Sequence, residues 1–158
     1  MSQFHSQALC HGGVTRRRFM WLTGLSAAAV ASGCATNPVT GKSQFMTVSA
    51  EEEVQIDRQY SAMQFSDDYG AVQDAELNAY VSGIGRAMVP QTHRPDMPYS
   101  FRVVNATYIN AYAFPGGSIA CTRGILLNLD NEAELAALLG HEIGHVNARH
   151  TAEQMSKG

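Results

Sequence analysis

Three residues near the end of the chain have the types and the spacing of a metal-dependent hydrolase. His141, Glu142 and His145 form the pattern His-Glu-x-x-His within a leucine-rich stretch. At 3.6 residues per helical turn the two histidines differ in direction by about 40°, so both imidazoles can reach one zinc ion. Glu142 lies about 100° round the helix, where it can reach a water on that metal.

This arrangement predicts general-base hydrolysis of peptide bonds. Zn²⁺ lowers the pKa of a bound water to about 7. The carboxylate of Glu142 takes the proton as the water attacks a carbonyl, and then returns it to the leaving amine. The alternative is an ordinary helix with polar surface residues. The leucine-rich surroundings favour the zinc site, because a buried His or Glu needs a partner.

The third metal ligand is harder to place. In one class of such proteases it is a histidine six positions after the second one, and here that position is Thr151. On a continuing helix His150 would face roughly opposite His141, which predicts a surface or supporting residue rather than a ligand. Glu153 is on the same helix, and the upstream acids are poorly suited. We therefore expect the third ligand, a glutamate, to be absent from this chain.

Helix signals surround the motif and precede it. Asn131, with Glu134 three residues later, caps a helix that we expect to carry the motif on toward the chain end. Ser49 and Glu52 form a capping box for an earlier helix that ends at residues 67–70, and a further helix fits residues 74–88. Both early helices carry apolar stripes that we interpret as core-packing: Val54, Ile56, Tyr60 and Met63 in one, and Leu77, Tyr80, Val81, Ile84 and Met88 in the other.

Strand signals lie between these helices. Residues 99–104 alternate apolar Phe101 and Val103 with polar neighbours, which predicts a strand. Two β-rich runs, residues 108–114 and 118–122, flank Pro-Gly-Gly and predict a hairpin. The order of elements predicts an α+β domain with helices packed on a small sheet.

The first 33 residues have the form of an export signal. Arg16 and Arg17 begin a charged cluster of the twin-arginine kind, followed by a moderately apolar run. Residues 31–34 resemble a lipobox, which predicts lipidation of Cys34; the alternative is a plain signal cleaved nearby. The expected organisation is a signal at 1–33, a turn-rich tether at 34–48, and part of a metallopeptidase domain at 49–158.

Composition narrows the function classes. A net charge of −3 and a pI near 6.0 provide no basic face for nucleic acid. With Cys10 in the signal and Cys34 lipidated, Cys121 has no partner, so we expect no disulfide within the chain. The apolar run of the signal is short for a membrane span, and a membrane-embedded protease is disfavoured.

Three stretches together resemble the HtpX-like family of zinc metallopeptidases, which includes the CAAX prenyl endopeptidases. These stretches are residues 110–117, 122–126 and 132–145. The resemblance is closest to the soluble, periplasmic lipoprotein branch. It implies a zincin-like domain of the gluzincin type, with His141 and His145 as zinc ligands and Glu142 as the base. It also implies that the strand of Asn110, Ala111 and Ala113 pairs with an extended substrate, and that a glutamate on a later helix completes the metal site, so we expect the chain to be incomplete at its C-terminus.

The resemblance also implies a function. We expect a zinc metalloendopeptidase that cuts misfolded or misassembled envelope proteins, held on the periplasmic face of the inner or outer membrane through lipid on Cys34. Two alternatives remain open. One is a non-catalytic lipoprotein that binds unfolded clients through the hairpin edge, and the other is an inactive fragment of the protease.

Overall fold

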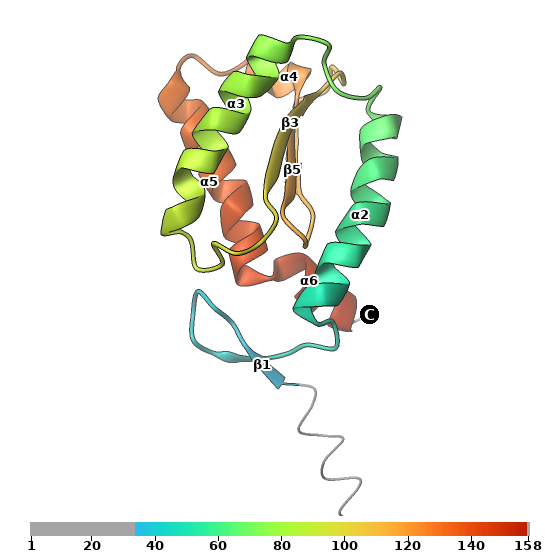
Figure 1. Ribbon diagram of the computed structural model, residues 1–158, viewed down its shortest axis with the longest axis vertical. Coiled ribbons are helices and arrows are strands. Elements are labelled where there is room, and N and C mark those ends of the chain that lie inside the picture. The colour runs from blue at the N-terminus through green and yellow to red at the C-terminus, as the bar shows by residue number, and fades with distance from the viewer. Residues whose placement is uncertain (1–33, 158) are drawn as a thin grey trace, which may run out of the picture. The chain divides into compact units, whose positions relative to one another are not determined.

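The computed structural model describes residues 34–157, and the expected export signal lies outside the described residues (Figure 1). Helices and strands are mixed along this part of the chain. Their order is β1 (Cys34–Thr36), β2 (Ser43–Phe45), α2 (Ala50–Asp67), α3 (Ala75–Met88), the short 3-10 turn η1 (Val89–Gln91), β3 (Ser100–Val104), β4 (Ala111–Ala113), β5 (Ser118–Thr122), α4 (Arg123–Leu126), α5 (Glu132–Ala148) and α6 (His150–Lys157).

A three-stranded sheet with the order β3-β5-β4 forms the centre of the domain. The hairpin predicted around Pro-Gly-Gly is confirmed, because β4 runs antiparallel to β5. The strand predicted at residues 99–104 is confirmed as β3, which pairs with β5 in parallel. Gly117 has a φ of 101°, a conformation that side chains other than glycine disfavour, so this residue permits the turn.

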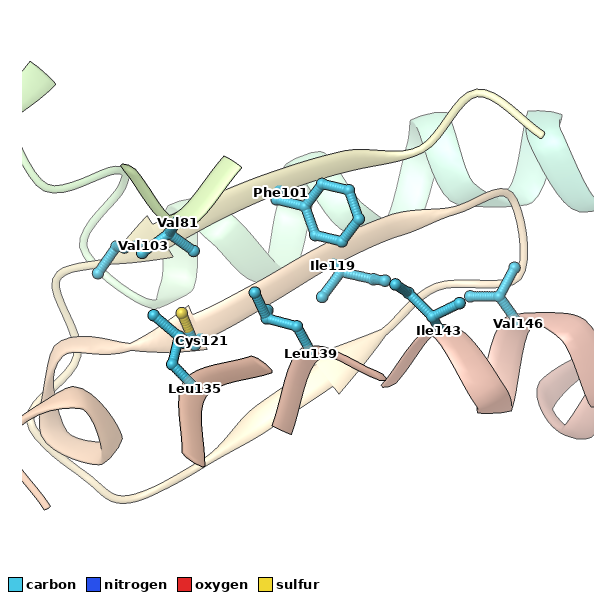
Figure 2. Close-up of a cluster of buried hydrophobic side chains, with 9 residues drawn as sticks. All are labelled: Val81, Phe101, Val103, Ile119, Cys121, Leu135, Leu139, Ile143 and Val146. Atoms are coloured by element: carbon cyan, nitrogen blue, oxygen red, sulfur yellow. The ribbon is translucent and has the colours of Figure 1, made fainter. Parts of the chain in front are cut away.

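Helices cover both faces of the sheet. In Figure 1, α3 and α5 lie on one side of β3 and β5, and α2 lies on the other. Figure 2 shows how side chains from the two strands meet those of α5 on the first face. This main core consists of nine buried residues: Val81, Phe101, Val103, Ile119, Cys121, Leu135, Leu139, Ile143 and Val146. The expected α+β class is confirmed.

The second face of the sheet packs against α2 through a smaller cluster. Phe65 of α2 meets Val104 and Ala120, and the rings of Tyr112 and Phe114 pack beside them. Successive residues of β4 therefore serve different layers: Tyr112 faces α2, whereas Ala111 and Ala113 pack on the main core beneath α5. The edge strand thus contacts both helical layers.

The predicted core stripe of α2 is wrong, although its capping box is confirmed. Tyr60 and Met63 are 51% and 58% exposed, and the buried face of the helix instead carries Glu53, Asp57, Ser61 and Phe65. The reason is that the buried polar groups have distant partners. Asp57, for example, accepts a hydrogen bond from the backbone N–H of Ser118 at 2.8 Å.

The stripe of α3 is largely confirmed. Val81 is completely buried, and Leu77, Ile84 and Met88 pack against the main core. Tyr80 is the exception: it is 48% exposed and donates its hydroxyl hydrogen to Glu132 at 2.6 Å. A polar tip lets this residue cover the core rim while its hydroxyl stays solvated.

Residues 34–48, expected as a tether, contain the two-stranded hairpin of β1 and β2. Asn37 is buried in it and donates to the backbone carbonyl of Ala148 at 3.1 Å, which satisfies a carbonyl in the last turn of α5. The segment is therefore packed on the domain, and its service as a membrane tether stays a prediction. Among the described helices, none combines the length and the apolar character needed to cross a bilayer.

Candidate metal centre

Helix α5 carries the His-Glu-x-x-His motif along the sheet. Its predicted start is confirmed, since the side chain of Asn131 accepts a hydrogen bond from the backbone N–H of Glu134 at 3.1 Å. Leu135, Leu139 and Ile143 anchor one side of the helix in the main core. This anchoring turns the motif toward β4, where the small side chains of Ala111 and Ala113 leave room beside it.

The two histidines of the motif face each other. Nε2 of His141 lies 3.0 Å from Nε2 of His145, and the ring centroids are 4.6 Å apart. Two nitrogens that bind one tetrahedral zinc at about 2.0–2.1 Å would lie about 3.3 Å apart, so only a small adjustment is needed. The structure therefore brings together the predicted ligand pair in a form that fits a single metal ion.

Glu142 lies beside this pair but points into the protein. It is 7% exposed, and burial raises the pKa of its carboxyl above the usual value, an effect that His141 partly offsets. A carboxylate with a raised pKa both accepts and returns a proton more readily near neutral pH. The position and the environment of Glu142 suit the general base that the sequence predicts.

The prediction that α5 continues straight to the chain end is wrong, and so is the position expected for His150. Helix α5 ends at Ala148, and Arg149 adopts a left-handed conformation with a φ of 58°. The chain turns there and α6 begins at His150. The turn brings Nδ1 of His150 within 2.8 Å of Nδ1 of His145, instead of placing His150 opposite His141.

A cavity of about 460 Å³ joins the motif to the edge strand. Its lining comes from β4, α5 and α6: Ala111, Tyr112, Ala113, His141, Glu142, His145, His150, Thr151 and Gln154. Within residues 34–157, no three His, Cys, Asp or Glu side chains are arranged so that they could hold a metal ion. The cavity thus offers two nitrogen ligands, a buried carboxyl group and space for a substrate.

The backbone of β4 is open on one side. Hydrogen bonds join Asn110 to Thr122 and Phe114 to Ser118, and bonded pairs in an antiparallel ladder alternate with non-bonded ones. The N–H and C=O groups of Ala111 and Ala113 therefore point away from β5. Asn110 was expected to bind the substrate backbone as well, but its backbone groups are already bonded to Thr122. Its carbonyl accepts from the N–H of Thr122 at 3.0 Å, and its N–H donates to the Thr122 hydroxyl at 3.2 Å.

Sequence reasoning missed the residues that hold the end of α5. Glu53 is completely buried, and it pairs with Arg149 at 2.9 Å and with Arg94 at 2.5 Å. These residues are far apart in the sequence. The apolar stripe predicted for α2 did not include Glu53, so only the structure reveals that this acid is buried and needs charged partners.

A helix that bears His-Glu-x-x-His beside the open edge of a small sheet is the arrangement of a metallopeptidase. Comparison with known sequences supports this class, because peptidase family M48 matches residues 75–158. That match covers more than half of the 158 residues, and the chain belongs to family M48. The resemblance to a metallopeptidase family seen in the sequence is thereby confirmed.

Curated relatives from bacteria and eukaryotes agree. The chain is 33% identical over 132 residues to the beta-barrel assembly-enhancing protease of Escherichia coli (strain K12), a match that covers 84% of this chain and 27% of the relative. It is 28% identical over 150 residues to the mitochondrial metalloendopeptidase OMA1 of Schizosaccharomyces pombe, covering 89% of this chain and 43% of the relative. The chain therefore spans about a quarter of the bacterial relative.

Proposed function

We propose that the protein is a zinc-dependent metalloendopeptidase. The observation that carries this proposal is the 3.0 Å approach of the Nε2 atoms of His141 and His145 beside the buried carboxyl group of Glu142. The metalloendopeptidase names of several relatives agree with it. His141 and His145 would hold the zinc ion, which supplies Lewis-acid polarisation of the scissile carbonyl and of water. Two protein ligands are fewer than the three usual at catalytic zinc, so the proposal includes a glutamate as the third ligand.

Three further residues of the cavity, Glu142, Ala111 and Ala113, each have a definite task in this proposal. Glu142 accepts a proton from the attacking water at its carboxylate and then donates that proton to the leaving amine. The outward N–H and C=O groups of Ala111 and Ala113 bind the substrate backbone as an added strand. Because this pairing uses main-chain groups, it selects extended, unfolded segments over any particular side chain. The methyl side chains of both alanines keep the substrate close to α5.

The proposed substrates are unfolded or misassembled proteins of the bacterial envelope. Support comes from the export signal expected at residues 1–33, from the lipobox that ends at Cys34, and from the bacterial relative named as a beta-barrel assembly-enhancing protease. Lipid on Cys34 would hold the protein at a membrane surface on the periplasmic side. The zincin-like arrangement suggested by the resemblance belongs to the same proposal.

Casein hydrolysis by a zinc-loaded protein that contains this chain together with the glutamate ligand tests the proposal. Glu142→Gln keeps the shape of the side chain but removes the base, so kcat falls by about 100-fold or more while zinc affinity stays within about twofold. Glu153→Gln is the matched control, because Glu153 lies on α6 and pairs with Lys157 outside the cavity. It retains full activity. Wild-type turnover in Glu142→Gln contradicts the assignment of the base.

The second candidate function is a non-catalytic protein that binds unfolded clients, and the open edge of β4 favours it. Both functions use Ala111 and Ala113, but only the protease needs Glu142. If the protein binds reduced, unfolded casein without cleaving it even when the glutamate ligand is supplied, and Glu142→Gln binds it equally well, the binding function is the correct one.

A further inference from the structure

We infer that Glu53, Arg149 and His150 position the imidazole of His145, so that its Nε2 atom is presented toward His141. The inference rests on the proposed function only in taking His141 and His145 as the metal ligands. None of these three residues needs to touch the metal or the substrate. They act through the turn that follows α5, and each step can be followed in the contacts of the described residues.

The first step is a buried cluster of charges at the end of α5. Glu53 is completely buried, and its two carboxylate oxygens separately bind Arg149 and Arg94. Both arginine side chains are about one-tenth exposed, at 11% and 10%. Burying this ion-paired cluster costs free energy that well-packed apolar residues would avoid, so net stabilisation does not account for its presence. Orienting the end of α5 does account for it.

The second step is the fixing of Arg149. Its Nε donates to Glu53 at 2.9 Å, and its Nη2 donates to the backbone carbonyl of Val48 at 2.8 Å. Arg94 joins the same end of the helix by donating to the backbone carbonyl of Val146 at 3.0 Å. The guanidinium group of Arg149 therefore ties the end of α5 to the segment before α2. The guanidinium group of Arg94 ties the last turn of α5 to the loop after η1.

The third step is the turn itself. A left-handed conformation is unfavourable for a residue with a Cβ atom, and glycine is the usual occupant of this position after a helix. Arg149 nevertheless has a φ of 58°. Its two charge-assisted hydrogen bonds, to Glu53 and to the carbonyl of Val48, are made only when the chain turns there, so they oppose that cost. The ion pair with Glu53 therefore selects the turn over a continuing helix.

The fourth step joins the turn to the metal pair. Nδ1 of His150 lies 2.8 Å from Nδ1 of His145, and Nε2 of His145 lies 3.0 Å from Nε2 of His141. A metal requires the lone pair of Nε2, so a neutral His145 must carry its proton on Nδ1 and donate it to Nδ1 of His150. His150 then carries its own proton on Nε2. A partner of this kind fixes both the tautomer and the direction of a ligating histidine.

Zinc affinity of the intact chain, measured by chelator competition, tests this inference without reference to hydrolysis. His150→Phe keeps a flat ring but provides no acceptor, and zinc binding weakens by about 10- to 100-fold. His150→Asn supplies an oxygen near the position of Nδ1 and restores most of the affinity. His150 is on the exposed surface, so both variants are expected to fold. Lys157→Ala, which removes the exposed ion pair of α6, is the control with unchanged affinity.

Arg149→Ala tests the turn. The substitution is expected to lower zinc affinity, as His150→Phe does. The double variant Arg149→Ala with His150→Phe should bind zinc as tightly as the single variant with the lower affinity, because the two changes break one chain of contacts. Long-range ¹H–¹⁵N spectra of the metal-free chain report the proton on Nδ1 of His145, which both single variants shift toward Nε2.

Wild-type zinc affinity in His150→Phe overturns the inference, and independent, additive losses in the double variant overturn the part assigned to Arg149. These outcomes are separate from the proposed function. If the protein cleaves no casein even when the glutamate ligand is supplied, but His150→Phe still weakens zinc binding, the proposed protease is wrong and the positioning of His145 stands.

Discussion

The hydroxyl group of Tyr112 donates a hydrogen bond to Oδ2 of Asp68 at 2.5 Å, and this bond joins the edge strand β4 to the C-cap residue of α2. Tyr108 donates to Oδ1 of the same carboxylate at 2.7 Å. Asp68 is 4% exposed, so the carboxylate is shielded from water. Tyr108 lies in the segment that leads into the proposed substrate strand, and Tyr112 lies in that strand.

Asp68 makes the stability of the domain depend on pH. Burial alone raises the pKa of Asp68, but hydrogen bonds from Tyr112, Tyr108 and Gln64 together outweigh it and hold the pKa below its usual value. The stabilisation is therefore complete above the pKa of the unfolded chain, near 3.9, and is lost as the pH falls through the lower folded-state pKa. Urea unfolding of wild type and Asp68→Asn across the acid range measures it.

Asp68→Asn is expected to lower the free energy of unfolding at neutral pH by about 1–3 kcal/mol and to remove this part of the acid dependence. Tyr69→Phe serves as the control, because Tyr69 is 79% exposed. An Asp68→Asn variant that loses stability in acid as steeply as wild type contradicts the assignment.

Gly116 sets how closely the hairpin tip approaches α2. A Cβ atom at this position would lie 2.6 Å from Cβ of Asp57 and 2.8 Å from Cα of Val54. Gly116→Ala is therefore expected to destabilise the domain by about 1–3 kcal/mol. Gly83→Ala is the matched control, because its Cβ would meet nothing within 4 Å in α3, and it should add up to about 1 kcal/mol. Thermal unfolding compares the two, and equal effects would rule out the close approach.

Ala113→Pro tests the substrate strand. The N–H of Ala113 points away from β5, so proline removes a donor from the open edge without breaking the β4–β5 ladder. The expected result is a fall of about tenfold in kcat/KM for casein, carried mainly by KM, with little loss of stability. Tyr112→Pro should instead unfold the hairpin, since that N–H faces β5. An unchanged KM in a folded Ala113→Pro variant would exclude backbone pairing at this position.

Cys121 is expected to be unreactive in the folded protein. It is completely buried on β5, and burial raises the pKa of its thiol to about 11. At pH 8 the thiol therefore stays protonated as well as inaccessible. Iodoacetamide labelling followed by peptide mass spectrometry should find Cys121 unmodified before urea is added and modified afterward. Rapid labelling of the native chain would mean that β5 opens readily.

Local signals predicted the elements whose stabilising groups lie close together in the sequence. The capping box of Ser49 and Glu52, the cap of Asn131 on α5 and the Pro-Gly-Gly turn all act within a few residues, and each is present in the structure. The ligand pair follows the same rule, because a spacing of four residues on one helix brings His141 and His145 together.

Features that depend on distant contacts were not predictable in this way. The apolar stripe of α2 predicted the wrong buried face. Glu53 lies on the buried face instead, because it pairs with arginines that are 41 and 96 positions away in the sequence. The turn at Arg149 has no glycine or proline to mark it, and it depends on the same ion pair. The parallel pairing of β3 with β5 is also non-local. The chain passes from β3 to β4 at the far edge and then returns to β5 between them, an order that no local pattern specifies.

The contact between Glu53 and Arg149 also has a consequence for the order in which the chain matures. Helix α5 can form from local signals, but the turn that seats His150 on His145 requires a segment synthesised 96 positions earlier to have docked already. Contacts of such long range form late, since loop closure must come first. A newly made chain therefore carries His141 and His145 before it has their geometry, and the enzyme we propose would gain its activity only as a finished fold.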